Sequence, residues 1–119
     1  MTEQDWDFFP DDPPQFQIGE LVKHCRYHYR GVVVDFDMRC MADEDWYLAN
    51  KTQPERDQPW YHVLIDGSNA VSYAAQTSLE EDPSDQPVHH PLVTHLFERF
   101  DQGWYERNDR PWPGFLSQI

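Results

Sequence analysis

The sequence predicts a mostly β protein, a small and strongly bent barrel of about five strands with a helical insertion and a C-terminal helix. The chain of 119 residues has the length of one domain. Short runs rich in β-branched and aromatic residues alternate with turn residues, a pattern typical of strands joined by hairpins. Aromatic residues make up 15% of a chain that is only 39% hydrophobic, so we expect a core built from a few large rings.

Residues 1–15 have the composition of an acidic, flexible leader. Residues 1–16 carry three prolines, no basic residue and five acids, which are Glu3, Asp5, Asp7, Asp11 and Asp12. Trp6, Phe8 and Phe9 lie among these acids, a pattern found both in short recognition segments and in disordered tails that carry exposed rings. The sequence leaves both interpretations open.

Two strands are expected next, over residues 18–24 and 29–36. The first is opened by the turn residue Gly19, and the second is dense in β-branched and aromatic residues. Gly31 within the second run indicates a bulge or a close approach of another backbone segment. Because only residues 25–28 separate the two runs, we predict a hairpin.

Residues 37–59 form a long insertion between strands. Asp43 to Asn50 is expected to fold as a short helix, with Asp43 as the N-cap and further acids in the first turn. Residues 51–59 form a polar loop with two prolines. Insertions of this length in a small domain are often functional or mobile.

A second hairpin is predicted over residues 60–75. Its strands are residues 60–65 and 71–75, and residues 66–69 supply the turn. Residues 78–81 resemble a helix-capping box, but Pro83 would end any helix at once. We therefore expect a single 3₁₀-like turn there.

The C-terminal third, residues 83–119, is predicted to contain a helix and an irregular aromatic segment that pack on the barrel. Pro91 suits the first position of a helix that runs to about Phe100. Four apolar residues of this stretch recur at helical spacing, namely Leu92, Leu96, Phe97 and Phe100. The order of strands and hairpins over residues 16–82 indicates an SH3-like barrel.

Composition narrows the class of protein. Asp and Glu number 22 against 9 Lys and Arg, a formal net charge of -13, which argues against unspecific affinity for nucleic acid. No stretch approaches the ~20 apolar residues that a membrane span needs, and the N-terminus lacks the pattern of a signal peptide. Cys25 and Cys40 are too few for a disulfide scaffold, so we expect a cytoplasmic protein.

The chain offers no recognisable catalytic or metal-binding motif. Its six histidines are accompanied by no Cys-x-x-Cys pair, so a structural zinc site is not predicted. No serine lies in a Gly-x-Ser-x-Gly elbow, and the five glycines form no phosphate-binding loop. We therefore predict a protein without enzymatic activity, metal or cofactor.

One basic and aromatic patch is the candidate binding site. It combines three cations with two interleaved rings: Lys23, Arg26, Tyr27, Tyr29 and Arg30. Such a patch can grip a phosphate backbone or stack a base, and it can equally grip an acidic protein segment. Alternatively, Lys23 and Arg26 only neutralise the acids that flank them.

Four sequence blocks, taken together, resemble a known family. They are Gly19-x-x-Val22-Lys23-His24, Tyr29-Arg30-Gly31-Val32-Val33, the run QPWYHVLI at 58–65, and Tyr73-Ala74-Ala75-Gln76-x-x-Leu79-Glu80. In this order they resemble the HspQ/YccV-like domain, often labelled hemimethylated DNA-binding. The continuation through residues 90–100 is similar to the version of this domain that is fused to an F-box protein.

The resemblance implies an SH3-like barrel without catalytic residues, and it implies two alternative functions. One is protein quality control, as an adaptor or regulatory factor in ATP-dependent proteolysis and the heat-shock or stress response. Its partner would be such a protease or its substrate. The other is binding of hemimethylated DNA through Lys23, Arg26, Arg30 and Arg39, although the acidity of this chain departs from that expectation. Exposed strand edges would also allow the chain to self-associate.

Overall fold

The computed structural model describes residues 13–114. Most of the predicted leader, including Trp6, Phe8 and Phe9, lies outside the described residues, as does Phe115. Ten elements follow in order: β1 (Leu21–His24), β2 (Arg30–Asp37), α2 (Glu44–Ala49), β3 (Trp60–Ile65), β4 (Val71–Ala75), η1 (Gln76–Ser78), β5 (Leu79–Glu81), α3 (Val93–Leu96), β6 (Phe97–Asp101) and β7 (Trp104–Arg107). The predicted mostly β fold is confirmed.

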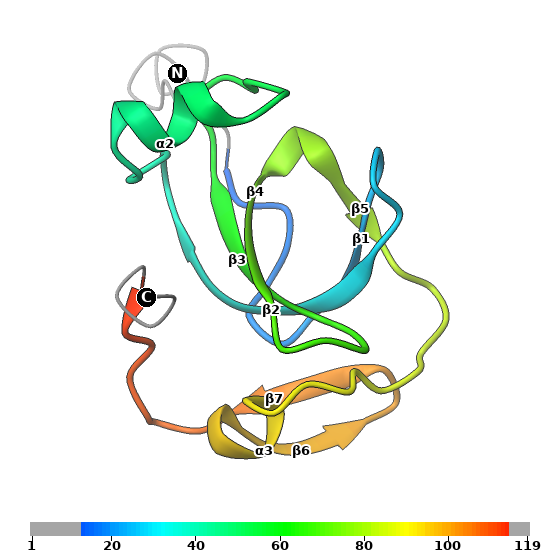
Figure 1. Ribbon diagram of the computed structural model, residues 1–119. Coiled ribbons are helices and arrows are strands. Elements are labelled where there is room, and N and C mark those ends of the chain that lie inside the picture. The colour runs from blue at the N-terminus through cyan, green and yellow to red at the C-terminus, as the bar shows by residue number, and fades with distance from the viewer. Residues whose placement is uncertain (1–12, 115–119) are drawn as a thin grey trace, which may run out of the picture.

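Five of the strands form one antiparallel sheet in the order β4-β3-β2-β1-β5. The sheet bends strongly around itself, but it does not close, because β4 and β5 stand at its two edges (Figure 1). The two predicted hairpins are present, and β3 and β4 have the predicted bounds. Among the described residues, no helix is both long and apolar enough to cross a membrane.

Gly31 fulfils one of its two predicted roles. A Cβ atom at this position would overlap the carbonyl oxygen of Leu64, so glycine permits the close approach of β2 and β3. The irregularity in the ladder lies elsewhere, between Val33 and Asp35. Of the two alternatives predicted for Gly31, the close approach is therefore the one found there, and the bulge of β2 lies further along the strand.

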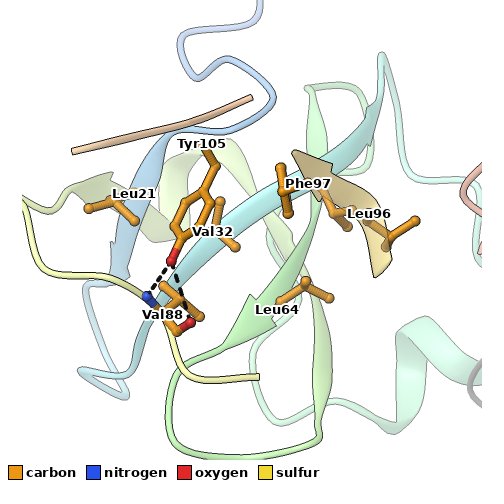
Figure 2. Packing of buried hydrophobic residues seen from close by; sticks show 8 residues of the cluster. Leu21, Val32, Leu64, Val88, Leu96, Phe97 and Tyr105 are labelled. Atoms are coloured by element: carbon orange, nitrogen blue, oxygen red, sulfur yellow. Dashed lines mark hydrogen bonds between the residues drawn. The ribbon is translucent and has the colours of Figure 1, made fainter. Parts of the chain in front are cut away.

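The central strands are buried on both faces, which explains their nearly continuous apolar sequence. On the inner face of the bent sheet, Val22, Val33 and Tyr61 belong to one cluster. On the outer face a second cluster joins sheet residues to the C-terminal region, and its members are Leu21, Val32, Val34, Leu64, Val88, Leu96, Phe97 and Tyr105. Figure 2 shows Tyr105 over this cluster, with its hydroxyl bonded to the Val88 main chain.

The prediction of a C-terminal helix to Phe100 is wrong beyond Leu96. Only α3 is helical, and β6 and β7 follow it as a two-stranded hairpin. The register of the hairpin shifts between Phe97 and Arg99, so a bulge places Phe97 and Phe100 in contact with the same ring, Tyr105. A bulged strand thereby produces the three-residue spacing that is otherwise typical of a helix.

Two further expectations need correction. Residues 104–107, predicted as part of an irregular segment, form strand β7. The 3₁₀ turn occurs at Gln76–Ser78, and Leu79–Glu81 forms strand β5, which pairs with β1. The local sequence does not reveal this pairing because β5 has only 3 residues and its partner is distant in the chain.

The predicted helical insertion is confirmed, including its cap. The Asp43 carboxylate accepts the backbone N–H of Trp46 at 2.8 Å, as an N-cap should. Trp46 and Tyr47 of α2 pack over a third cluster that contains Trp60 and Tyr73. In Figure 1, α2 lies at the end of the barrel opposite the β6–β7 hairpin.

Candidate binding cleft

An aromatic cleft of about 250 Å³ opens between the β1–β2 connection, strand β4 and the α2 insertion. Six rings line it: Tyr27, Tyr29, Trp46, Tyr47, Trp60 and Tyr73. The other lining residues are polar or small, and no Asp, Glu, Lys or Arg is among the residues that line it. The cleft is therefore an uncharged surface within a strongly acidic protein.

His24 organises one wall of the cleft. Its Nδ1 accepts the backbone N–H groups of Arg26 and Tyr27 at 3.1 and 3.0 Å, which folds the connection over the end of β1. The imidazole lies against Tyr27 and Tyr29, with ring centroids 4.7 and 5.1 Å away. Since Nδ1 is an acceptor, the proton of the neutral ring is on Nε2, which remains as a donor. Burial lowers the pKa of His24, and nearby His28 and Arg26 lower it further.

The opposite wall consists of rings that the insertion holds in place. Trp46 and Tyr47 make edge contacts with Trp60, at centroid distances of 6.2 and 6.4 Å. The Tyr47 hydroxyl donates to the carbonyls of Gln53 and Pro54, which ties the helix to the loop that follows it. These contacts fix the shape of the cleft before any ligand arrives.

The structure divides the predicted patch into two parts. Tyr27 and Tyr29 line the cleft, and the Tyr29 hydroxyl lies 2.7 Å from the Ser72 hydroxyl of β4. Arg26 is exposed beside them, with its guanidinium 5.7 Å from the centre of the Tyr27 ring. These three residues form a continuous surface with the cleft.

Lys23 and Arg30 lie on the outer face of the sheet, by alternation from Leu21 and Val32. They are cross-strand neighbours, and Lys23 is also paired in register with Glu80. Their place on the opposite face separates them from Tyr27 and Tyr29.

Arg30 is engaged by the protein itself. Its Nε donates to Asp82 at 2.8 Å and its Nη1 to Asp66 at 2.9 Å. The same guanidinium also donates to the carbonyls of Gln86 and Pro87. Arg30 therefore ties β2 to the connection that leads to the C-terminal hairpin.

A second polar cluster links the insertion to the sheet. The Tyr73 hydroxyl donates to Asp37 at 2.7 Å, and His62 Nε2 lies 3.4 Å from the same carboxylate oxygen. Burial lowers the pKa of His62 although Asp37 opposes the shift, and burial also raises the pKa of Tyr73. Within residues 13–114, no group of three or more His, Cys, Asp or Glu side chains is placed to hold a metal ion.

Three buried histidines should make the fold sensitive to mild acid. Burial lowers the pKa of His24, His62 and His90 below the ordinary value of 6.5. The unfolded chain therefore binds more protons below that pH, and the free energy of unfolding should decrease as the pH falls from 7 to 5. The slope is at most about 1.4 kcal/mol per pH unit for each histidine. Urea unfolding across this range measures it, His62→Gln should reduce the slope, and stability that is flat or rises towards pH 5 would contradict the prediction.

Sequence reasoning missed the cleft residues outside the patch. Trp46, Tyr47, Trp60 and Tyr73 come from three elements that only the folded chain brings together. The available signal was the pair Trp46-Tyr47 in a helix of 6 residues, which is too short to bury two large rings against a core of its own.

The strongly bent, open sheet and its cleft are those of a small, mostly β binding domain. Residues 14–104 match the family model described as "Hemimethylated DNA-binding protein YccV like", and the chain belongs to this family, which confirms the resemblance seen in the sequence. The family is one of binding domains rather than of known enzymes.

Curated relatives place the same domain in much longer proteins. The chain is 35% identical over 97 residues to the F-box only protein 21 of Homo sapiens and to that of Mus musculus. The match covers 78% of this chain but 15% of each relative, so the chain spans only a small part of the proteins that it matches.

Proposed function

We propose that this chain is a non-enzymatic binding module that holds a segment of a partner protein in the aromatic cleft and serves protein turnover as an adaptor or regulatory factor. The observation that carries the proposal is the cleft itself, with its six preformed rings and its uncharged lining. Clustered aromatic rings are typical of the energetic centres of protein interfaces. The two unpaired cysteines suit a function in the reducing cytoplasm.

The relatives support a link to protein turnover. F-box proteins are subunits of ubiquitin ligases, and the matched relatives are F-box proteins. A domain of this family within such a protein would hold a substrate or a regulatory partner. By the same logic, this chain would connect substrates to a ubiquitin ligase or to an ATP-dependent protease.

Reconstituted degradation tests this proposal. The full chain is added to a purified Lon-type or Clp-type protease, and in parallel to a ubiquitin ligase assembled on an F-box subunit, each with a labelled substrate. We expect the chain to associate with at least one system and to change the rate of degradation or ubiquitination. Tyr27→Ala should remove this effect, while Trp104→Ala, on the distant hairpin, should keep it. No association and no change in rate with any of these systems would overturn the proposal.

The description of the family favours DNA binding as the second candidate. In this chain, Arg26 and Lys23 would have to supply most of the phosphate contacts, because Arg30 is occupied by Asp66 and Asp82 and Arg39 is paired with Asp57 at 3.3 Å. Titration with unmethylated, hemimethylated and fully methylated duplexes at several salt concentrations tests it. Phosphate contact would show as affinity that falls steeply with salt and that Lys23→Glu combined with Arg26→Glu abolishes. Binding that is absent, or that is equal for all three duplexes, would contradict this candidate.

A further inference from the structure

We propose that the segment Asp5-Trp6-Asp7-Phe8-Phe9 of the chain's own leader docks in the aromatic cleft and competes there with the partner segment. This inference rests on the function proposed above, because it adds a regulation of the same cleft. Residues 1–12 lie outside the described residues. Four features support the proposal: the point at which the described chain begins, the length of the leader, the cations that border the cleft and the rings that line it.

The described chain begins close to one end of the cleft. The Gln76 side chain holds this beginning, since its Nε2 donates to the Pro13 carbonyl at 3.1 Å and its Oε1 accepts the Gln15 N–H at 2.8 Å. Gln76 directly follows Ala75, which lines the cleft, and Ser78 lines it as well. The leader is therefore attached to the body of the domain beside the cleft.

The leader is long enough to reach the cleft. A chain spans at most about 3.6 Å per residue, so Phe8, which precedes Pro13 by about five residues, can lie up to about 18 Å from it. A tethered segment also acts at an effective concentration on the order of millimolar. Weak contacts therefore suffice for it to compete with a partner that arrives from solution.

Cations border the cleft on two sides. The Arg26 guanidinium lies 5.7 Å from the centre of the Tyr27 ring, and the Arg56 guanidinium lies 5.0 Å from that of Tyr47. Lys51 is exposed between two residues that line the cleft. Within residues 13–114, no carboxylate forms an ion pair with any of these three cations. The border can therefore receive the carboxylates of an acidic segment.

The charge of the whole chain favours a segment that is already attached. Asp45 and Glu55 are exposed next to lining residues, and the chain carries a formal net charge of -13. This field opposes an acidic segment that arrives on another molecule. Residues 1–12 carry five acids and no base, but their attachment beside the cleft makes the approach intramolecular. The bordering cations and the tether together favour the chain's own leader over an acidic segment of another protein.

The lining suits one aromatic side chain of this segment. The cleft volume of about 250 Å³ is below the roughly 300–1,000 Å³ of pockets that hold whole small molecules. Its walls are rings, with which Trp6, Phe8 or Phe9 would make edge and face contacts. Trp6 and Phe8 are each next to an aspartate in the sequence. The docking of either ring would therefore bring a carboxylate to the cations at the border.

Photo-crosslinking in the full chain tests the docking directly. p-Benzoylphenylalanine replaces Phe8, the dilute chain is irradiated, and the cross-linked peptides are identified by mass spectrometry. We expect cross-links within one chain to residues that line the cleft, such as Tyr27, Trp46 or Tyr47. Cross-links only to residues outside the cleft would overturn the proposal. Cross-links that join two chains would assign the cleft to the leader of a second copy, which would also overturn it.

A labelled peptide with the sequence of residues 1–12 tests whether the cleft is occupied within the chain. It is titrated by fluorescence anisotropy into the wild-type chain and into the leader variant, which is the full chain with Trp6→Ser, Phe8→Ser and Phe9→Ser. We expect the leader variant to bind the peptide at least tenfold more tightly, because its own segment no longer competes. Equal binding by the two chains, or no binding by the leader variant, would overturn the proposal.

Further changes locate the contact and test the charges. In the leader variant, Tyr27→Ala should weaken the peptide at least fivefold without changing the circular dichroism spectrum. Trp104→Ala, which removes a ring 46% exposed on β7, is the matched control and should bind normally. Equal binding by both would place the peptide elsewhere and overturn the proposal. A peptide whose five acids are replaced by their amides should bind at least fivefold more weakly, and equal or tighter binding would overturn the role of the cations.

The two proposals fail in different ways. If the peptide behaves as expected while neither the wild type nor the leader variant affects degradation or ubiquitination, the turnover function is wrong and the docking of the leader stands. If Tyr27→Ala removes the effect on degradation while the wild type and the leader variant bind the peptide alike, the function stands and the docking is wrong.

Discussion

Replacing Gly19 by alanine should destabilise the protein by about 3 kcal/mol or more. Gly19 has a φ of +95°, and a Cβ atom there would overlap the backbone carbonyl of Tyr105. Its N–H donates to Val33 at 2.8 Å, and its carbonyl accepts the N–H of Tyr105 at 3.0 Å. The substitution therefore strains the backbone and separates the sheet from the β7 strand at the same point. Urea unfolding followed by tryptophan fluorescence measures the loss.

Gly67→Ala is the matched control for this effect. Gly67 also has a positive φ, +75°, but a Cβ atom there would meet nothing within 4 Å. Gly67→Ala should therefore lower the free energy of unfolding only by the cost of a positive φ for alanine, about 1–2 kcal/mol. Equal losses for the two variants would show that the contact of Gly19 with Tyr105 contributes nothing beyond the positive φ.

Arg30→Met should lower the free energy of unfolding by about 3 kcal/mol at pH 7. A residue that served only to bind a partner would contribute far less to stability. The change leaves Asp82, whose side chain is only 7% exposed, and the partly buried Asp66 without their cation. It also frees the carbonyls of Gln86 and Pro87. Urea unfolding of the variant at pH 7 gives the loss. Arg99→Met, which breaks an exposed pair with Glu106, is the control and should cost less than about 1 kcal/mol.

The loss at Arg30 should depend on pH in a defined direction. Burial alone would raise the pKa of Asp66, but the His89 N–H and Arg30 outweigh it and lower that pKa. Arg30 and Ser84 likewise overcome the effect of burial on Asp82 and lower its pKa. Because the folded-state values are depressed, this stabilisation is complete above the ordinary aspartate value of 3.8 and is lost as the pH falls through the lower folded values. The stability difference between wild type and Arg30→Met should therefore shrink towards pH 3, and a constant difference would contradict the assignment.

The elements that the sequence predicts correctly are those whose signals are local. The β3–β4 hairpin is marked by two apolar runs around the turn at residues 66–69, and the register follows from that turn. The N-cap at Asp43 likewise depends on residues within one turn of helix. Neither case requires knowledge of the rest of the chain.

The failures come from contacts between distant segments. A bulge between Phe97 and Arg99 gives a strand the apolar spacing of a helix, and only the Tyr105 ring shows which interpretation is right. Strand β5 exists because β1 offers it a free edge. The local pattern is ambiguous in both places, and tertiary packing decides the outcome.

The candidate site shows the same division. Tyr27 and Tyr29 can be proposed from sequence because they lie among basic residues. That Trp60 and Tyr73 also line the cleft depends on how the insertion folds back over the sheet. Arg30 looks like a binding residue in the sequence because its partners, Asp66 and Asp82, are 36 and 52 positions away. Charge density along the chain therefore identifies cations but not which of them are already neutralised.

The position of Tyr105 has a consequence for moving this domain between proteins. Its ring covers the outer cluster, and its hydroxyl is held by the main chain of Val88. A fragment cut after β5 would uncover Leu21, Val32 and Leu64, which are at most 3% exposed in the intact structure. The unit that can be moved between proteins is thus the bent sheet together with its C-terminal hairpin, up to Arg107. This unit is slightly longer than the family match, which ends at residue 104. A fusion protein that contains the five-stranded sheet alone would expose this apolar face to solvent and would be prone to aggregation.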